Sequence, residues 1–377
     1  MVKGHKIRLF PTKEQEKLFY KHIGSCRFIY NWGLETQIRQ YQETGKKFSS
    51  FDLIKQLTPL KKQDEYRWLN EVSNTSLKNS LRDLDSAYQR FFSKQNKFPK
   101  FKSKKKSKLA YSVRYDSVYF TEDNTVNIEK VGKVKYKTNY DVPIGKGVKF
   151  QNPRISLING KWILSIAFEV ENQEIKLTDE SMGIDLGVKE LAIMHMGNEN
   201  LMAKNINKSP TLRKRMKKLK RLQRQVSRKY HINGNWDKTH NILKLEAEIR
   251  ELQYHISMTR KNHIHHTTRS FINKHPYRVV MEDLNVTGMM KNKHLSKAIA
   301  EENFHEFIRQ MKYKCEELGI EFIQVGKWYP SSKTCSCCGT IKRDLKLKDK
   351  IYRCPECGLE IDRDINAAIN LSKYVVG

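Results

Sequence analysis

Four of the seven cysteines have the spacing of a metal site. Cys335 and Cys338 form one CxxC pair, Cys354 and Cys357 form a second, and a glycine follows each pair. Glycine permits the tight backbone turn that follows such a pair, and two turns of this kind bring four thiolates onto one ion. The spacing therefore predicts a closed, structural Zn²⁺ site with these four cysteines as ligands.

The other three cysteines are not expected to bind metal. Cys337 lies between two ligands, Cys315 falls in a predicted helix, and Cys26 lies near an apolar helix face. The last two are typical of ordinary core residues. Because the cysteine segment is too short to bury a core of its own, we expect metal binding to fold it.

Three acidic residues lie within or beside apolar elements. Asp185 is inside the strand MGIDLGV, Glu282 ends the strand YRVVMED, and Asp364 opens the last helix in DRDINAAIN. A buried carboxylate is costly unless it is paired or bound to a metal. Mg²⁺ or Mn²⁺ prefers such oxygen ligands, and two ions about 4 Å apart would support phosphodiester hydrolysis. We therefore expect the three acids to share a divalent-cation site.

The pattern alone leaves the choice of acids open, since a single acid in a strand is more often a salt-bridge partner or a turn residue. Asp283 competes with Glu282, because strand alternation places the two on opposite faces without saying which face holds the metal. Asp362 competes with Asp364, and chain geometry does not decide between them.

Hydrophobic periodicity outlines the elements that must position these residues. A strand is expected at residues 4–10, then helices through the first hundred residues, then β-structure from about 115 to 170 with a hairpin turn at Asn159-Gly160. Residues 171–181 have the polar composition of a linker. The elements expected after it are two strands around Gly187, a helical hairpin at 211–271 turning at 233–235, the strand YRVVMEDL, the helix ENFHEFIRQMKYKCEEL, the strand IEFIQVG and a final helix at 364–374.

The charge is strongly positive and clustered. The chain has 72 Lys and Arg against 41 Asp and Glu, a formal charge of +31. Self-repulsion of this size calls for counter-charges, which nucleic acid most commonly supplies. Residues 90–114 and 201–232 contain no acid, so both stretches are expected to line phosphates, with a solvated helix face as the alternative. The candidate contacts are Lys104, Lys105, Lys106, Lys217, Lys218 and Arg221.

Two aromatic residues, Phe98 and Phe101, lie inside the first basic stretch. They could stack on bases or anchor the loop to the core, and we favour the anchor. No segment approaches the roughly 20 apolar residues of a membrane span, and MVKGHKIRLFPTKEQ lacks the apolar region of a signal peptide. Paired cysteines in such a chain indicate a reducing compartment. We therefore expect a cytoplasmic protein without a membrane partner.

Several motifs occur in an order that resembles the TnpB family, the nucleases encoded by small bacterial insertion sequences and related to the type V CRISPR effectors. They are GIDLGVKELAI, VVMEDLNVTGMMKN, EFIRQMKYKCEELGI, WYPSSKTCSCCG and CPECGLEIDRDINAAINL. IRLFPTKEQ, SCRFIYNWGL, WLNEV, AYQRFF and FPKFKSKKK extend the resemblance over almost the whole chain. The family's usual tryptophan near the start of the EFIRQMKYK helix is Phe304 here, a conservative departure.

The resemblance implies a multidomain α+β fold. Its parts would be a wedge-like β-barrel (residues 1–10 and 115–175), a helical recognition lobe (11–114), an RNase-H-like RuvC nuclease domain (182–334 and 359–377) and an inserted zinc ribbon (335–358). It also implies that Asp185, Glu282 and Asp364 are catalytic and bind Mg²⁺ or Mn²⁺. The resemblance thereby selects Glu282 over Asp283 and Asp364 over Asp362.

The resemblance further implies a structured guide RNA that directs cleavage of DNA beside a transposon-associated motif. Duplex DNA and a displaced single strand would be the other partners. A bacterial, nucleoid-associated location is implied as well. The motif must be read through base edges or groove shape, and Thr75, Lys78 and Arg82 are candidates, with an exposed helix face as the alternative. The competing hypothesis is a transposase, or a transposition-regulating DNA-binding protein without guided cleavage. A repressor on this scaffold should have lost an acid, and none is missing.

Overall fold

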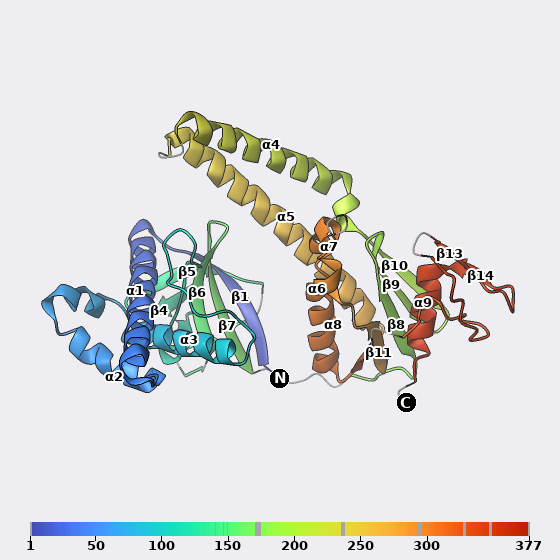
Figure 1. The fold of residues 1–377 in the computed structure, drawn as a ribbon, viewed down its shortest axis with the longest axis horizontal. Coiled ribbons are helices and arrows are strands. Elements are labelled where there is room, and N and C mark those ends of the chain that lie inside the picture. Colours follow the sequence, from blue (N-terminus) through green and yellow to red (C-terminus); the bar gives the residue numbers. More distant parts are fainter. Residues whose placement is uncertain are drawn as a thin grey trace. The chain divides into compact units, whose positions relative to one another are not determined.

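The protein is represented by a computed structural model, which describes residues 2–139, 141–145, 147–148, 150–169, 175–234, 238–292, 294, 296–326, 329–346 and 349–375. The chain forms two compact units, Met1–Val170 and Glu171–Gly377 (Figure 1). Within the described ranges, no helix combines the length and the apolar character that crossing a bilayer requires.

Unit 1 is built on a seven-stranded sheet with the order β2-β6-β7-β1-β5-β4-β3. β1 (Val2–Phe10) lies in its middle and pairs antiparallel with β7 (Lys161–Glu169) and β5 (Gly132–Lys137), so the first strand joins the later β-structure as expected. Closure of this sheet into a barrel stays a prediction. The other strands are β2 (Ala110–Ser112), β3 (Tyr119–Phe120), β4 (Thr125–Ile128) and β6 (Gln151–Ile158).

The predicted hairpin turn between β6 and β7 is confirmed. Ile158 pairs with Lys161 across the turn, and Asn159 and Gly160 have φ angles of 48° and 76°. A two-residue hairpin turn of type I′ needs this left-handed backbone at both positions, which asparagine and glycine tolerate best.

The helices of unit 1 are α1 (Lys13–Thr44), α2 (Ser50–Leu60) and α3 (Asn74–Phe92), with 3₁₀ segments at Asp64–Glu71 and Tyr115–Ser117. A capping box between Thr12 and Gln15 begins α1. Phe19 of α1 packs on Trp162 of β7 with ring centroids 4.8 Å apart. The helices and the sheet share one hydrophobic core, and the domain boundary expected between them stays a prediction.

Unit 2 contains a five-stranded sheet with the order β10-β9-β8-β11-β12. β8 (Ser181–Leu186), β9 (Glu190–Met196) and β10 (Glu199–Lys204) form an antiparallel meander. β11 (Arg278–Glu282) runs parallel to both β8 and β12 (Glu321–Val325). The strands expected at YRVVMEDL and IEFIQVG are therefore confirmed, whereas β10 is an addition that the periodicity did not predict.

The helical hairpin expected at residues 211–271 is confirmed. α4 (Pro210–Ile232) and α5 (His240–Ile272) lie side by side as the two longest helices of this unit in Figure 1. Gly234, with a φ of 63°, follows α4, while residue 235 lies outside the described residues. The remaining elements are the 3₁₀ segment Ile206–Lys208, α6 (Val286–Met289), α7 (Ser296–Glu302), α8 (Phe304–Leu318), β13 (Ile351–Arg353), β14 (Glu360–Asp362) and α9 (Arg363–Ser372).

Helices cover both faces of the five-stranded sheet. On one face α5 and α8 bury Met182 and Ile184 of β8. On the other, Leu371 of α9 packs with Val280 of β11. A Cβ on Gly183 of β8 would overlap the backbone of α9, including the carbonyl carbon of Leu371 at 2.9 Å. Glycine at this position is therefore what lets α9 lie directly against β8.

We predict that Gly183→Ala destabilises unit 2 by about 1–3 kcal/mol, the usual cost of forcing an extra methyl into a packed interior. The overlap is with helix backbone, which cannot swing aside. Gly24→Ala in α1 is the matched control, because a Cβ there meets nothing within 4 Å and alanine favours helix. Thermal unfolding of both variants measures the difference, and equal melting temperatures would contradict the packing argument.

Candidate functional site

Asp185 and Glu282 lie near the same end of two adjacent parallel strands. Met281 of β11 pairs with Ile184 of β8, so the next residue of each strand is one of these acids. Strand alternation places Asp185 on the same face as Gly183, and Glu282 on the same face as Val280. Both acids therefore face α9. Ligands of open α/β sheets bind outside such carboxyl ends of strands.

Asp364 joins them from the first turn of α9. The neighbouring Asp362 caps this helix, because its Oδ1 accepts hydrogen bonds from the backbone N–H groups of Asp364 (2.9 Å) and Ile365 (3.3 Å). Arg363 donates from Nε (3.1 Å) and Nη2 (2.9 Å) to Oδ1 of Asp364. Asp362 is thus occupied as a cap, whereas the carboxylate of Asp364 is held by a guanidinium.

The pKa of Asp185 indicates that the three acids lie near one another. Burial raises the pKa of Asp185 well above its usual value, and the negative charges of Glu282 and Asp364 raise that pKa further, while Arg363 opposes the shift. Asp283 is exposed, and its backbone N–H donates to the carbonyl of Val325.

The arrangement suits divalent cations. Three carboxylates supply hard oxygen ligands, and their repulsion shows in the raised pKa of Asp185. Among the described residues, only the cysteine quartet forms a metal-binding group whose ligand atoms all lie within 4.8 Å of one another. The three carboxylates do not form such a group in this structure, so a shared cation site at these acids stays a prediction.

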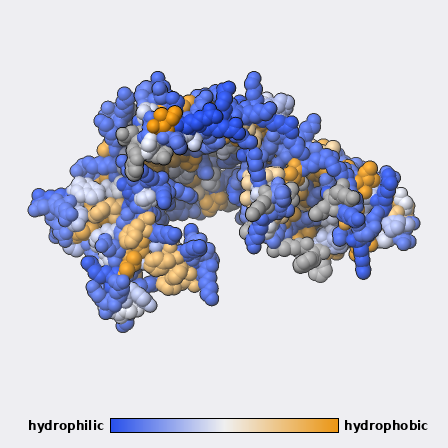
Figure 2. Space-filling model, turned by 45° about the horizontal axis from the view of Figure 1, so that its top comes forward, coloured by the Kyte–Doolittle hydropathy of each residue, from blue (hydrophilic) through white to orange (hydrophobic). Residues whose placement is uncertain are grey.

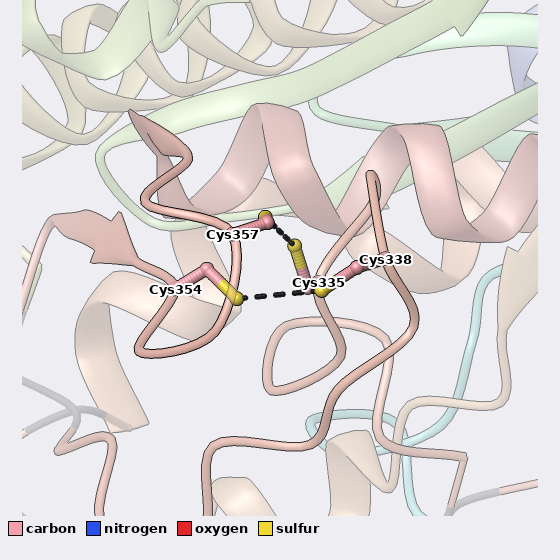
Figure 3. Close-up of side chains that lie close together, drawn as sticks. All are labelled: Cys335, Cys338, Cys354 and Cys357. Carbon is pink, nitrogen blue, oxygen red and sulfur yellow. Dashed lines mark hydrogen bonds between the residues drawn. The ribbon is translucent and has the colours of Figure 1, made fainter.

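The four predicted cysteines converge on one point (Figure 3). The Sγ atoms of Cys335 and Cys357 are 3.6 Å apart, and those of Cys338 and Cys354 are 3.5 Å apart. A tetrahedral Zn²⁺ site with Zn–S bonds of about 2.3 Å has S···S edges of about 3.8 Å. The quartet therefore has nearly the dimensions of a zinc site.

The surroundings of the quartet favour metal binding. Hydrogen bonding to Thr340 lowers the pKa of Cys338 to about 6, and thiolate is the ligand form. The pKa of Cys357 is raised instead, because burial and the neighbouring Cys338 and Cys354 outweigh its backbone hydrogen bond with Leu359. Tyr352 of β13 is fully buried beside the cysteines and bonds through its hydroxyl to the carbonyls of Lys333 and Thr340, both at 3.3 Å.

The three cysteines outside the quartet lie where core or non-ligand residues were expected. Burial raises the pKa of Cys26 and of Cys315 to about 12, as suits inert core thiols. Cys337 is exposed and lies outside the quartet.

Sequence reasoning missed several residues around the acids. Ser331 donates a hydrogen bond to Oε1 of Glu282, and Asn366 and Asn370 of α9 bond to the segment that carries Ser331. No local pattern marks Ser331. The two asparagines could have been found, because residues four positions apart, as in NAAIN, share one helix face.

The candidate nucleic-acid contacts lie at or near the surface. On α3, Arg82 is exposed while Thr75 and Lys78 are half-buried, and Lys104, Lys105 and Lys106 are exposed in a turn. Lys217, Lys218 and Arg221 are exposed on α4. Phe98 contacts Tyr88 and Phe91, as the anchor hypothesis expects, but both Phe98 (45%) and Phe101 (58%) are exposed. Hydrophilic residues predominate on the face shown in Figure 2.

Three family models match the chain. They are a "Helix-turn-helix domain" over residues 1–46, a "Probable transposase" over 165–293, and a "Cas12f1-like, TNB domain" over 304–371. Together they span both units and include all three acids and all four cysteines of the quartet.

Two relatives extend this match over the whole chain. A "Putative RNA-guided DNA endonuclease" of Streptomyces pristinaespiralis is 30% identical over 98% of this chain and 88% of its own. The chain belongs to the TnpB family. A second member, "Putative RNA-guided DNA endonuclease InsQ" of Escherichia coli (strain K12), is 29% identical over 98% of this chain and 91% of its own. The resemblance seen in the motifs is thereby confirmed.

The fold is similar to that of a protein in a solved complex with RNA and DNA. The structure of a Cas12f1–sgRNA–target DNA complex aligns over 99% of this chain and 98% of its own with a TM-score of 0.64 and 14% identity. At this identity the likeness concerns the fold alone. It supports the expected multidomain, RuvC-like architecture of this TnpB-family chain.

We predict that the purified protein carries about one zinc ion per chain and that Cys354→Ser removes it, because a closed site tolerates no missing sulfur. The melting temperature should fall as well, since metal binding folds the segment. Cys337→Ser is the matched control and should keep its zinc. Zinc content measured by atomic spectroscopy decides the point, and equal zinc in the two variants would refute the quartet as the site.

Proposed function

We propose that the chain is an RNA-guided DNA endonuclease encoded by an insertion sequence, which cuts DNA next to a transposon-associated motif by divalent-metal-dependent phosphodiester hydrolysis. The observation that carries the proposal is the convergence of Asp185, Glu282 and Asp364 at one end of the unit 2 sheet. Relatives named as RNA-guided DNA endonucleases over almost the full length of this chain support the guided activity.

In this proposal the three carboxylates bind Mg²⁺ or Mn²⁺ and are the catalytic residues. Bound divalent ions would activate water and stabilise the leaving oxygen of the phosphodiester. The protein's own part is to hold the acids rigidly: Asp185 and Glu282 on paired strands, and Asp364 by Arg363, whose Nη1 also donates to the carbonyl of Asp349 (3.1 Å). Arg363 relieves only part of the repulsion at Asp185.

The same proposal assigns functions to the cysteine segment and to unit 1. The cysteine quartet with β13 and β14 is a zinc ribbon inserted into the nuclease domain before Asp364. The sheet of unit 1 is the wedge-like barrel, and α1–α3 are the recognition lobe that holds the guide RNA. The strongly basic chain suits such a partner, because Lys and Arg neutralise phosphates and release counterions. Guide pairing would then read the DNA sequence.

The competing hypothesis assigns the same fold to a transposase, or to a regulator of transposition without guided cleavage. A regulator has no need of three acids kept together against their repulsion. A transposase would join DNA ends, so strand-transfer products from purified protein and transposon ends would favour it over the endonuclease.

We predict that Asp185→Ala lowers DNA cleavage by at least about 100-fold, the lower end of what losing one electrostatic stabiliser of a transition state costs. Binding of RNA and target DNA should stay nearly unchanged, because Asp185 lies in β8, outside the two basic stretches. Asp283→Ala is the matched control and should cleave normally. Cleavage retained in Asp185→Ala, or lost in Asp283→Ala, would refute the site assignment.

We predict that α4 contacts phosphates mainly through Lys217 and Arg221. Replacing both with alanine should weaken RNA binding and lower the slope of log K against log salt by about one per lost contact. Lys218→Ala is the comparison, because its ammonium is already 2.6 Å from Glu248 and should contribute less. Titrations at several salt concentrations measure the slopes, and unchanged slopes would show a merely solvated helix face.

A further inference from the structure

Ser331 is a buried serine whose hydroxyl is committed to one of the proposed catalytic acids. Its side chain donates a hydrogen bond to Oε1 of Glu282, and the residue is 1% exposed. A carboxylate at the end of a strand can adopt several rotamers. A fixed donor on one oxygen selects among them and leaves the other oxygen for a cation. The hydroxyl is therefore placed to orient Glu282.

Two asparagines of α9 hold the segment that carries Ser331. Nδ2 of Asn370 donates to the carbonyls of Ser331 and Thr334, both at 2.7 Å. Nδ2 of Asn366 donates to the same carbonyl of Thr334 at 2.7 Å, and its Oδ1 accepts from the backbone N–H of Ser336 at 3.0 Å. Asn366 and Asn370 are 0% and 5% exposed, so the clamp is shielded from water.

The clamped segment runs directly into the cysteine quartet. Cys335 lies between the clamped residues Thr334 and Ser336, and its backbone N–H donates to the carbonyl of Thr340 at 2.9 Å. The helix that provides the clamp also carries Asp364 in its first turn. One short stretch of backbone thus joins a metal ligand of the quartet to the serine that bonds Glu282.

We propose that Ser331 is a positioning residue for Glu282, and that metal bound by the quartet fixes Ser331 through the Asn366 and Asn370 clamp. Occupancy of the cysteine site then controls the divalent-cation affinity of the acidic site. This inference rests on the proposed function of the three acids. Residues that orient metal ligands in this way typically change metal affinity by about 10–100-fold when they are removed.

The test measures Mn²⁺ binding to the full-length protein by electron paramagnetic resonance, together with zinc content and thermal melting. Ser331→Ala should weaken Mn²⁺ binding by about 10–100-fold while zinc content and melting stay at the wild-type values. Ser331→Thr, which keeps the hydroxyl, should restore the affinity. Ser332→Ala, one residue away and half-buried, is the matched control and should bind Mn²⁺ like the wild type.

The second arm removes zinc with Cys354→Ser, which should lower the Mn²⁺ affinity by a similar factor. Three results would overturn the positioning role. The first is unchanged Mn²⁺ affinity in Ser331→Ala, and the second is a Ser331→Thr protein that binds Mn²⁺ as weakly as Ser331→Ala. The third is loss of zinc or of the melting transition in both Ser331 variants. Unchanged affinity in the zinc-free protein would overturn the coupling. Mn²⁺ binding that survives Asp185→Ala would instead refute the proposed acidic site itself, so the two failures are distinguishable.

Discussion

Repulsion among three carboxylates at one end of a sheet is the constraint on which the rest of unit 2 depends. Asp185 is held beside Glu282 and Asp364, and burial together with the two neighbouring charges raises its pKa well above the usual value. Such a cluster lowers the stability of a folded chain unless a cation neutralises it. Arg363 supplies one positive charge against three carboxylates, so negative charge remains that divalent ions can neutralise.

Keeping that cluster together requires contacts between the first and the last elements of unit 2. β8 and β11 are paired in parallel, and α9 is pressed against β8 because residue 183 has no side chain to separate them. The same helix presents Asp364 in its first turn and Asn366 and Asn370 to the segment before the cysteines. α9 is therefore the element that connects the acidic site with the proposed zinc ribbon.

Features that depend on a few neighbouring residues could be predicted from the sequence. The cysteine quartet followed from ligand spacing, and the Asn159-Gly160 turn followed from backbone preference, since both depend on a few consecutive residues. The helical structure expected in the first hundred residues includes α2, but its bounds were not predicted, because it is short, buries few residues and contains Pro59. β10 was not predicted either, since its residues are mostly exposed and lack a buried face.

The composition of the acidic site was harder to predict, because tertiary contacts decide it. The choice between Glu282 and Asp283 depends on which face of β11 meets α9, and that is set by Val280 packing on Leu371. The role of Ser331 depends on a hydrogen bond to a residue 49 positions earlier in the chain. No periodicity in the sequence encodes such a contact.

The most direct test of the account is a crystal structure of the full-length protein soaked in Mn²⁺, with anomalous scattering used to locate the metal. The account predicts two manganese peaks about 4 Å apart, in contact with carboxylate oxygens of Asp185, Glu282 and Asp364. Manganese bound through Asp283 or Asp362 instead, or absent from the three acids at saturating Mn²⁺, would contradict it.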